Sequence, residues 1–385
     1  MTVVVINAIS IKEGGSLVVL KRLLCAMVEL RPEWHWHVAT NVEASLSLVD
    51  AHGMTCHVFR DDEFSGWKVR LWYETALPKL LNQVNADLLF SQTNYLPSRK
   101  LACPALLLVQ HAGHFSDRFK DMTEAQLGSF GARVGWRLKG YWVKSSVRHA
   151  QEVTVQTKAL AVGIRLETGL PAERIHVIAH GTGQAVHSEW LPTAPKPEQS
   201  VRIGYITKYG IQKNFVVLFK AVAQLKAAGL RPILVLTLAS EMTETRDTLA
   251  VAEGLGILDC LENHGNLAGV ELTQIYRSLH VFVFPSWCES FGFPMVEALA
   301  HGLPLLVGAT ESNIEVAGNG GLTFAPDDPL TLAALIQRLI KEPGWHEARA
   351  QASLERSRQF TWKKSAKSTL ALMDCMLKTP EKYTT

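Results

Sequence analysis

Residues 281–304 read VFVFPSWCESFGFPMVEALAHGLP, and this stretch decides the fold class of the chain. Its first four residues are apolar, which suits a strand buried on both faces of a parallel sheet. A short loop follows, and then Pro294, whose fixed φ and missing backbone donor suit the first turn of a helix. The stretch therefore predicts a strand, a glycine-containing loop and a helix, the repeating unit of a doubly wound α/β sheet.

The loop and the first turn of this expected helix carry two acids, Glu289 and Glu297. Backbone amides at a helix N-terminus bind phosphate, and Gly292 lets the backbone approach a ligand closely. Glu289 would point towards the group that the phosphate carries, and Glu297 could accept hydrogen bonds from ribose hydroxyls. Because the helix dipole alone favours Glu in a first turn, the whole string, more than the two acids, indicates a nucleotide site.

The alternation of strand and helix continues through the rest of the chain. A β-branched run at residues 3–6, a loop with Gly14 and Gly15 and a helical pattern at 17–30 open the first half. Residues 191–200 hold three prolines and no apolar periodicity, which is typical of a linker. Two such halves predict two Rossmann-like domains that face a ligand cleft. Further strands are expected at residues 35–39, 87–91, 105–110, 152–156, 175–178, 201–205, 233–238 and 303–307.

The composition is typical of a folded protein with two cores. The chain has 385 residues, 47% of them hydrophobic, and its net charge of +3 is too mild to indicate a nucleic-acid partner. The six cysteines form no CxxC pair, which favours buried thiols in a reducing compartment. With no basic leader and no run of roughly 18 apolar residues, we expect a cytoplasmic protein.

The stretch at 281–304 resembles the retaining glycosyltransferases of the GT-B fold, specifically family 4. Glu289 and Glu297 match the two acids of that family's motif, and the similarity covers most of the second half. Phe-Thr-Trp at 360–362 is similar to the start of the family's last helix. The resemblance implies a GT-B fold with an N-terminal acceptor domain at 1–190 and a nucleotide-sugar donor domain at 200–358. A helix at about 360–380 is expected to cross back to the N-terminal domain.

The resemblance also implies roles for residues of the second half. In the family the first acid contacts the donor sugar, the second holds the ribose, and the pyrophosphate sits on the amides between them. Lys213 matches a lysine that stabilises leaving-group charge. The family's arginine has no counterpart at 204–205, so either Lys208 substitutes or a tyrosine-bearing variant of the loop is used. The expected donor site comprises Lys208, Lys213, Leu267, Glu289, Ser290, Phe291, Gly292, Phe293 and Glu297.

In the first half the resemblance rests on a glycine loop and a histidine. Gly14 and Gly15 sit where family members have a loop that faces the donor phosphates and the acceptor. His111 and His114 follow an apolar run, where many members place a His at the donor sugar or the reacting centre. A lone His at a strand end is more often structural. Of the two, we assign His111, the first after the run, to the catalytic site.

The chemistry implied by the resemblance needs no metal ion. The sugar–phosphate bond loosens towards an oxocarbenium-like state, and the acceptor hydroxyl attacks from the front face, which retains the configuration. Lys213 and the helix-start amides would stabilise the charge on the leaving diphosphate. No Asp-x-Asp motif occurs, and the adjacent acid pairs at 61–62 and 327–328 lie in polar loops. We therefore expect neither a metal nor another cofactor.

A basic stretch with interleaved aromatics lies at residues 125–151, which contain no acid. Such a segment suits an anionic membrane surface, with Trp136 and Trp142 inserting if they face outward. The alternative is a helix whose tryptophans pack into the domain's own core. The expected membrane patch comprises Arg133, Arg137, Lys139, Lys144 and Arg148.

The resemblance implies a retaining hexosyltransferase of bacterial lipopolysaccharide or polysaccharide biosynthesis, and with the basic stretch it implies a peripheral position on the cytoplasmic membrane. Its donor would be an NDP-sugar, with GDP-mannose or GDP-rhamnose preferred over UDP-sugars, and its acceptor a saccharide or lipid-linked saccharide. The alternatives are a non-catalytic GT-B nucleotide-binding subunit and a GT-B sugar epimerase. A dehydrogenase is disfavoured because no GxGxxG follows the first strand.

Overall fold

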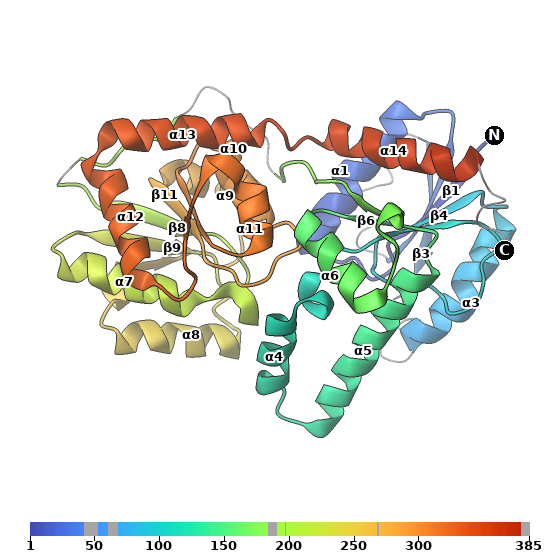
Figure 1. Ribbon diagram of the computed structural model, residues 1–385, viewed down its shortest axis with the longest axis horizontal. Helices are drawn as coiled ribbons and strands as arrows, with labels where there is room; N and C mark the ends of the chain where they lie inside the picture. The colour runs from blue at the N-terminus through green and yellow to red at the C-terminus, as the bar shows by residue number, and fades with distance from the viewer. Residues whose placement is uncertain (42–52, 61–67, 184–190, 197, 268, 379–385) are drawn as a thin grey trace. The chain divides into compact units, whose positions relative to one another are not determined.

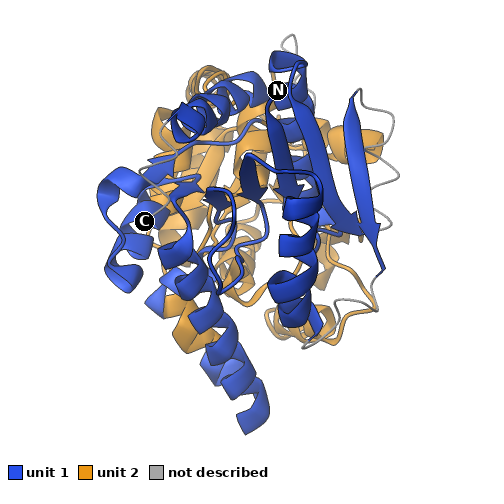
Figure 2. Ribbon diagram, turned by 90° about the vertical axis from the view of Figure 1, so that its right-hand side faces the viewer, with its two compact units in different colours: residues 1–117, 124–181, 361–385 blue, residues 118–123, 182–360 orange. Residues whose placement is uncertain are grey.

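The computed structural model describes residues 1–41, 53–60, 68–183, 191–196, 198–267 and 269–378 (Figure 1). The chain forms two compact units, coloured separately in Figure 2. Unit 1 comprises Met1–Asp117, Glu124–Gly181 and Thr361–Thr385, and unit 2 comprises Arg118–Thr123 and Thr182–Phe360. Each unit contains one parallel sheet, so the expected pair of α/β halves is confirmed.

The sheet of unit 1 has the order β3-β2-β1-β4-β5-β6-β7. Apolar runs form its central strands, and every residue of β4, β5 and β6 is buried. One face packs against α3, α5 and α6, whose apolar side chains share a core with those of the strands. The strands are β1 (Val3–Asn7), β2 (His35–Asn41), β3 (Met54–Phe59), β4 (Leu88–Ser91), β5 (Ala105–Leu108), β6 (Glu152–Val155) and β7 (Ile175–Val177).

The helices between these strands follow apolar periodicity in the sequence. Ser129 caps α5 by accepting a hydrogen bond from the amide of Ala132, and Thr157 caps α6 in the same way. Gly169, in the left-handed region at φ 70°, ends α6. The helices of this part of the chain are α1 (Gly14–Leu30), α3 (Lys68–Gln83), η2 (Ala112–Phe115), α4 (Asp117–Gln126), α5 (Phe130–His149), α6 (Lys158–Thr168) and η3 (Ala172–Arg174).

The sheet of unit 2 has the order β10-β9-β8-β11-β12-β13. The apolar run at the start of the quoted stretch forms β11, which is fully buried between β8 and β12. The strands are β8 (Val201–Tyr205), β9 (Pro232–Leu236), β10 (Leu261–Asn263), β11 (Val281–Phe284), β12 (Leu305–Gly308) and β13 (Gly321–Phe324). The helices are η4 (Ile211–Lys213), α7 (Phe215–Ala227), α8 (Thr243–Gly254), η5 (Leu258–Cys260), α9 (Gly269–Ser278), α10 (Phe293–Ala300), α11 (Glu311–Ala317), η6 (Gly318–Gly320), α12 (Pro329–Lys341) and α13 (Pro343–Ser357).

The last helix, α14 (Trp362–Lys378), belongs to unit 1, although unit 2 precedes it in the chain. It packs along α1 and buries Leu370, Met373 and Met376 (Figure 1). An ion pair of 2.8 Å joins Arg31, at the end of α1, to Asp374. The helix that was expected to cross back to the N-terminal unit is therefore present at these residues.

Two features differ from the sequence expectation. The strands β3 and β10 are not predicted, because β3 is a half-exposed edge strand and β10 has only three residues, all half-buried. The proline-rich segment at 191–200 is not the boundary between the units, which divide at Gly181 and Thr182. The reason is that Pro192 and Pro195 are buried within unit 2, so this segment packs as part of that unit.

Candidate functional site

Two loops at the centre of the unit 2 sheet bring the expected donor residues together. Residues 206–214 connect β8 to α7, and residues 285–292 connect β11 to α10. Because β8 and β11 are neighbours at the point where the strand order reverses, both loops leave the sheet at its topological switch point. Open α/β sheets bind their ligands at such a point.

Lys213, at the end of the first loop, forms an ion pair with Glu289 in the second, with 2.6 Å between Nζ and Oε1. The two side chains are 12% and 13% exposed, so solvent screens the pair only weakly. Ser286 donates a hydrogen bond from Oγ to the same carboxylate oxygen, at 2.7 Å. The structure thus brings together two residues that the sequence assigns to one site.

Several hydrogen bonds hold the two loops against each other. Asn214 donates from Nδ2 to the carbonyl oxygens of Pro285 and Pro326, at 3.3 and 2.8 Å. The amide of Trp287 donates to the carbonyl of Gln212 at 2.8 Å. Asn214 has a φ of 50°, a left-handed conformation that Asn adopts more readily than most residues. These contacts fix the position of the backbone that carries Lys213.

The buried hydroxyl of Tyr205 stabilises the same loop by donating a hydrogen bond of 2.8 Å to the carbonyl oxygen of Lys213. Burial, together with the nearby carboxylate of Glu289, raises the pKa of Tyr205 well above its ordinary value. The phenol therefore remains protonated and keeps its role as a donor.

The N-terminus of α10 follows the second loop and begins at a glycine. Gly292, at the N-cap position, has a φ of 79° and provides no side-chain cap. A side chain at Gly292 would also collide with Met295 and approach Phe284. Both the positive φ and the lack of space for a Cβ atom therefore require glycine at this position. Pro294 lies in the first turn, as expected. Phe291 is buried and contacts Phe293 and Phe360 edge to face, while Ser290 is half-buried.

Glu297 lies in the second turn of α10, not in the first, and is buried instead of facing outward. Its Oε2 accepts a hydrogen bond of 2.7 Å from the hydroxyl of Tyr276. His301 stacks on the Tyr276 ring and contacts the Glu297 carbonyl oxygen through Nδ1 at 2.8 Å. Burial raises the pKa of Glu297, and the Tyr276 hydrogen bond partly opposes that rise. Burial and the adjacent Glu297 raise the pKa of Tyr276 as well.

The other carboxylate oxygen of Glu297, Oε1, lies close to the backbone of Gly183. A side chain at position 183 would collide with Glu297 Oε1, so the backbone of Gly183 closely approaches this atom. Oε1 therefore lies outside the Tyr276 hydrogen bond, against the backbone of unit 2.

Two other expected donor residues occupy loops of unit 2. Lys208 is exposed and stands three residues after β8, at the carboxyl end of the sheet. Leu267 is half-buried in the loop between β10 and α9. Both positions follow strands of the same sheet, but no hydrogen bond or ion pair of their side chains to Lys213 or Glu289 is observed among the described residues.

In unit 1, the structure separates the two histidines by environment. His111 is exposed and accepts a hydrogen bond of 3.3 Å from the amide of Gly113, which caps η2. His114 is buried and stacks on Trp136, with 4.2 Å between ring centroids. His114 is therefore part of the packing between η2 and α5, and His111 is the one of the two that is accessible.

The sequence predicts a loop at Gly14 and Gly15, but in the structure they are the first two residues of α1. Gly14 has a φ of 68°, and space around its Cβ position is open. The connection from β1 to α1 is therefore made by residues 8–13, and the glycines set the direction in which the helix begins.

The basic residues at 133–148 lie on α5, but neighbouring helices supply acids that the segment itself lacks. Glu124 on α4 forms a bidentate pair with Arg137, with both distances 3.0 Å, and Glu167 on α6 pairs with Lys144 at 2.6 Å. Arg148 donates to the carbonyl oxygens of Thr168 and Glu167. The expectation of five unpaired cations is thus corrected: two are neutralised by acids distant in sequence.

Of the two orientations that the sequence leaves open for the tryptophans, the structure has the one that packs on the domain. Trp142 donates from Nε1 to the carbonyl of Leu96 and packs on Tyr73 and Tyr95. Trp136 stacks on the buried His114. Both rings therefore belong to the side of α5 that packs on unit 1.

Four residues of the site are not predicted from the sequence: Ser286, Asn214, Tyr276 and Gly183. Asn214 follows Lys213 directly and Ser286 precedes Glu289 by three positions, so polar residues near the predicted ones are the signal that could have identified them. Tyr276 lies 21 residues before Glu297, and neither spacing nor periodicity connects the two.

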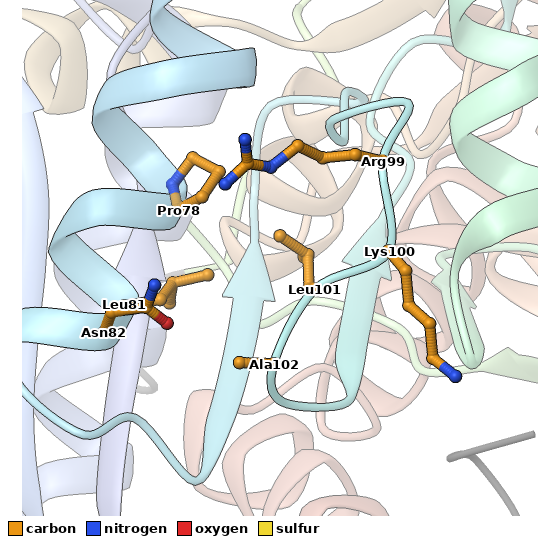
Figure 3. A pocket seen from close by; sticks show the side chains of 7 residues that line it. All are labelled: Pro78, Leu81, Asn82, Arg99, Lys100, Leu101 and Ala102. Atoms are coloured by element: carbon orange, nitrogen blue, oxygen red, sulfur yellow. The ribbon is translucent and has the colours of Figure 1, made fainter.

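Nothing in the described part of the chain forms a metal centre: its His, Cys, Asp and Glu residues make no group of three or more that could hold an ion. None of the helices in the described ranges is long and apolar enough to cross a membrane. A cavity of about 350 Å³ lies in unit 1, beside the end of α3 and the loop before β5 (Figure 3). None of the expected site residues lines it; its walls are Pro78, Leu81, Asn82, Arg99, Lys100, Leu101 and Ala102.

The second half of the chain matches a known protein family. Residues 187–357 match the family described as glycosyl transferases group 1. The O-antigen chain mannosyltransferase B of Escherichia coli is 30% identical over 106 residues, which are 28% of each chain. The D-inositol 3-phosphate glycosyltransferase of Thermobifida fusca is 29% identical over 231 residues, 56% of this chain and 52% of that protein. This chain thus spans between about a quarter and a half of these relatives.

Solved structures match nearly the whole length. Sucrose-phosphate synthase from Thermosynechococcus elongatus superimposes with a TM-score of 0.74 at 17% identity, covering 98% of this chain and 100% of that one. HepE of Anabaena, solved in complex with UDP-glucose, gives a TM-score of 0.72 at 17% identity and covers 97% of this chain and 100% of that one. At this identity the similarity concerns the fold, which is the two-sheet GT-B fold.

Proposed function

Since residues 187–357 belong to the glycosyl transferases group 1 family, we propose that this protein is a retaining glycosyltransferase that moves a sugar from a nucleotide-sugar to a hydroxyl acceptor. The observation that carries the proposal is the Lys213–Glu289 pair at the switch point of the unit 2 sheet. A cation and a carboxylate next to an uncapped helix N-terminus supply what a diphosphate-linked sugar requires.

In the proposed reaction Lys213 and the first amides of α10 bind the donor diphosphate. As the bond between the anomeric carbon and the phosphate oxygen breaks, they stabilise the growing negative charge without a metal ion. The acceptor hydroxyl attacks the anomeric carbon from the same face, and its proton passes to the departing phosphate oxygen. Atoms and charge balance, because the products are the glycoside and the nucleoside diphosphate.

Glu289 and Glu297 take different roles in this proposal. Glu289, freed from Lys213 when the diphosphate binds that cation, accepts hydrogen bonds from hydroxyls of the donor sugar. Oε1 of Glu297, which takes no part in the Tyr276 hydrogen bond and lies beside the Gly183 backbone, accepts hydrogen bonds from ribose hydroxyls in this proposal. Lys208 and Leu267 line the nucleotide side, and the exposed His111 of unit 1 acts at the donor sugar or the reacting centre.

The relatives support a donor class and an acceptor class. Two of them are named as mannosyltransferases, one for O-antigen chains and one described as MMP alpha-(1->4)-mannosyltransferase. These names favour GDP-mannose or the related GDP-rhamnose, and the complexes of HepE keep a UDP-sugar as the second choice. A saccharide or lipid-linked saccharide of lipopolysaccharide or polysaccharide biosynthesis is the proposed acceptor, used by a cytoplasmic enzyme held peripherally at an anionic membrane.

A donor screen with a Glu289→Gln variant tests the proposal. Purified protein is incubated with a panel of GDP- and UDP-sugars, and release of nucleoside diphosphate is measured with and without saccharide acceptors. Removal of one contact of this kind costs about 2.7–4 kcal/mol, so Glu289→Gln should turn over about 100- to 1000-fold more slowly. Glu253→Gln, an exposed Glu on α8, is the matched control and should retain full activity.

The screen also separates a transferase from a binding-only subunit. Nucleotide binding is followed in parallel by the shift in melting temperature on addition of GDP or UDP. Binding without turnover of any donor by the wild type would favour the non-catalytic alternative, and near-normal turnover of Glu289→Gln would remove Glu289 from the mechanism.

A further inference from the structure

A cavity of unit 1 lies apart from the residues of the candidate site (Figure 3). Its volume of about 350 Å³ falls at the lower end of the range of about 300–1,000 Å³ for pockets that bind small molecules. The end of α3 forms one wall, and residues 99–102, in the loop before β5, form the other. We refer to this space as the α3 cavity.

The α3 cavity lies at the amino edge of the unit 1 sheet. Helix α3 ends at Gln83, shortly before β4 begins at Leu88, and residues 99–102 precede the start of β5 at Ala105. Open α/β sheets bind their substrates at the opposite, carboxyl edge, which is the edge where His111 follows β5. A ligand of the α3 cavity is therefore separated from that edge by the length of β5, about 13 Å for a four-residue strand.

Hydrogen bonds hold the loop that forms the second wall. The amide of Leu96 donates to Oγ of Ser146 on α5 at 2.9 Å, and the amide of Ser98 donates to Oε1 of Glu74 on α3 at 2.8 Å. On the other side of residues 99–102 the chain enters β5, which pairs with β4. Because both ends of this segment are fixed, the cavity exists before a ligand binds, and binding does not have to order the loop.

The side chains around the α3 cavity give it a positive charge. They include Arg99 and Lys100 and no acid. Glu74, the one acid in the sequence of α3, already accepts from the Ser98 amide and pairs with Arg70 at 3.1 Å. The guanidinium of Arg99 makes no hydrogen bond or ion pair with any residue of the described ranges. Its donors are therefore available to an anion.

Figure 3 shows which of the two cations faces the cavity. Arg99 extends towards Pro78 on the opposite wall, whereas the ammonium of Lys100 points away from the other labelled side chains. A guanidinium binds a phosphate or a carboxylate through two parallel hydrogen bonds. Lys100 adds positive charge nearby without occupying the cavity, so the direct contact with an anion belongs to Arg99.

The rest of the lining combines apolar side chains with one amide. Pro78 and Leu81 are buried and Leu101 is half-buried, so hydrocarbon forms much of the wall. The side-chain amide of Asn82, at the end of α3, forms no hydrogen bond to any other residue that the structure describes. Such an amide can both donate to and accept from a hydroxyl group. The cavity thus offers an anion contact, an apolar surface and a hydroxyl contact.

We propose that the α3 cavity binds a small phosphorylated sugar or polyol, with its phosphate on Arg99, a hydroxyl on Asn82 and its carbon skeleton against Pro78 and Leu101. Free phosphate would leave the apolar wall and the amide without contacts, and a neutral sugar would leave the guanidinium without an anion. Because His111 lies at the other edge of the sheet, the ligand is an effector and not a reactant. It stabilises folded unit 1 by mass action, whatever reaction the protein catalyses.

Charge distinguishes a phosphate from a carboxylate as the anion. A phosphate monoester carries about −1.5 to −2 charges near pH 7, whereas a carboxylate carries a single one. The two cations of the α3 cavity, Arg99 and Lys100, match the larger charge. The chemistry of this cavity therefore favours a phosphate.

Isothermal titration calorimetry of the full chain tests the proposal. Glucose 6-phosphate, glucose 1-phosphate, glucose, glucuronate and inorganic phosphate are titrated separately in phosphate-free buffer, with and without excess GDP and UDP to occupy the proposed donor site. Arg99→Gln removes the anion contact, and its matched control is Arg165→Gln, at an exposed arginine of α6. Ala102→Trp fills the cavity from an exposed position of its wall and so leaves the core of unit 1 intact.

Wild type and Arg165→Gln should bind at least one of the two sugar phosphates more tightly than glucose, glucuronate or inorganic phosphate, with or without the nucleotides. Arg99→Gln should raise the dissociation constant by about 10- to 100-fold, as expected for the loss of a hydrogen bond to a charged group. Ala102→Trp should abolish binding. Absence of binding to wild type, or equal binding by wild type and both cavity variants, would overturn the proposal. Glucuronate or inorganic phosphate bound as tightly as the sugar phosphates would overturn the assigned ligand class.

Donor turnover without sugar phosphate keeps this site distinct from the proposed function. Arg99→Gln and Ala102→Trp should match wild type there, since neither residue belongs to the candidate site. A protein that binds a sugar phosphate through Arg99 but turns over no donor would refute the function alone, and one that turns over donor but binds no sugar phosphate would refute the effector site alone. Binding that disappears when GDP and UDP are added would assign the sugar phosphate to the donor site and overturn the effector site.

Discussion

Replacement of Tyr276 by Phe removes one buried hydroxyl and leaves the ring packing with His301 in place. That hydroxyl donates to Glu297 Oε2 at 2.7 Å, and both side chains are buried. In the variant the carboxylate loses its donor in surroundings that water does not reach. We therefore expect Tyr276→Phe to destabilise unit 2.

The size of the effect follows from the charge of the acceptor. A hydrogen bond to a charged group contributes about 1.5–3 kcal/mol, and a buried acceptor left without a donor loses this stabilisation. In a unit of this size each kcal/mol shifts the melting temperature by about 2–4 °C. The expected loss is therefore about 3–12 °C near neutral pH.

The loss should depend on pH, with a sign that the pKa of Glu297 determines. Burial raises this pKa in the folded protein above the ordinary value of 4.5. The neutral form is thus favoured by folding, and the resulting contribution to stability is present below the unfolded pKa and lost as the pH rises through the folded pKa. Because the Tyr276 hydrogen bond lowers the folded pKa, its removal raises that pKa further. The variant should be most destabilised at neutral pH and approach wild type on acidification towards 4.5.

Thermal unfolding of wild type and Tyr276→Phe at about pH 7.5 and about pH 5 measures both effects, since the difference between the proteins cancels the titration that they share. Tyr141→Phe, at a tyrosine 70% exposed, is the control and should melt with wild type at each pH. A Tyr276→Phe variant within 1 or 2 °C of wild type at neutral pH, or one with the same deficit at both pH values, would refute the role assigned to this hydroxyl.

Three further predictions concern catalysis and stability. Transfer should survive exhaustive EDTA treatment, since Lys213 and the α10 amides replace a cation; an absolute need for Mg²⁺ or Mn²⁺ would contradict this. Gly181→Ala should destabilise unit 1 by about 1–3 kcal/mol in denaturant titrations, because its Cβ would meet the backbone nitrogen and ring of Trp362, whereas Gly344→Ala, in open space, should not. Arg202 lowers the pKa of Glu262 to about 2, so the stability that this carboxylate contributes is present above its ordinary value of 4.5 and lost as the pH falls towards 2. Glu262→Gln should therefore be less stable than wild type at neutral pH, and acid titration of both proteins should show the difference disappearing at low pH.

Parts of the fold follow from local sequence because local burial is complete. The apolar run at 281–284 is the strand β11 to the residue, since a strand buried on both faces needs no polar alternation. The helix expected at about 360–380 is α14, whose apolar positions recur with helical spacing. The strand β3 is not predicted in this way, because it lies at a sheet edge and buries few of its side chains.

The site is predictable where topology alone brings residues together. Lys213 and Glu289 follow adjacent central strands, so a doubly wound sheet places them near each other once the two strands are identified. The burial of Glu297 and its partner Tyr276 depend on how α9 packs on α10, which no pattern within either helix encodes. The neutralisation of Arg137 and Lys144 likewise depends on acids of two other helices.

The return of α14 to unit 1 has a consequence for biosynthesis. On the ribosome the first 181 residues emerge long before residues 361–378, and residues 182–360, which form most of unit 2, are made between them. Until then the surface of α1 that covers Leu370, Met373 and Met376 lacks its cover, and Arg31 lacks Asp374. Most of unit 2 is one uninterrupted stretch of chain that can fold as it emerges, whereas unit 1 is completed last although it begins first. The nascent chain therefore exposes apolar surface of its earliest helix for most of its synthesis, and this is the interval in which chaperones would be needed.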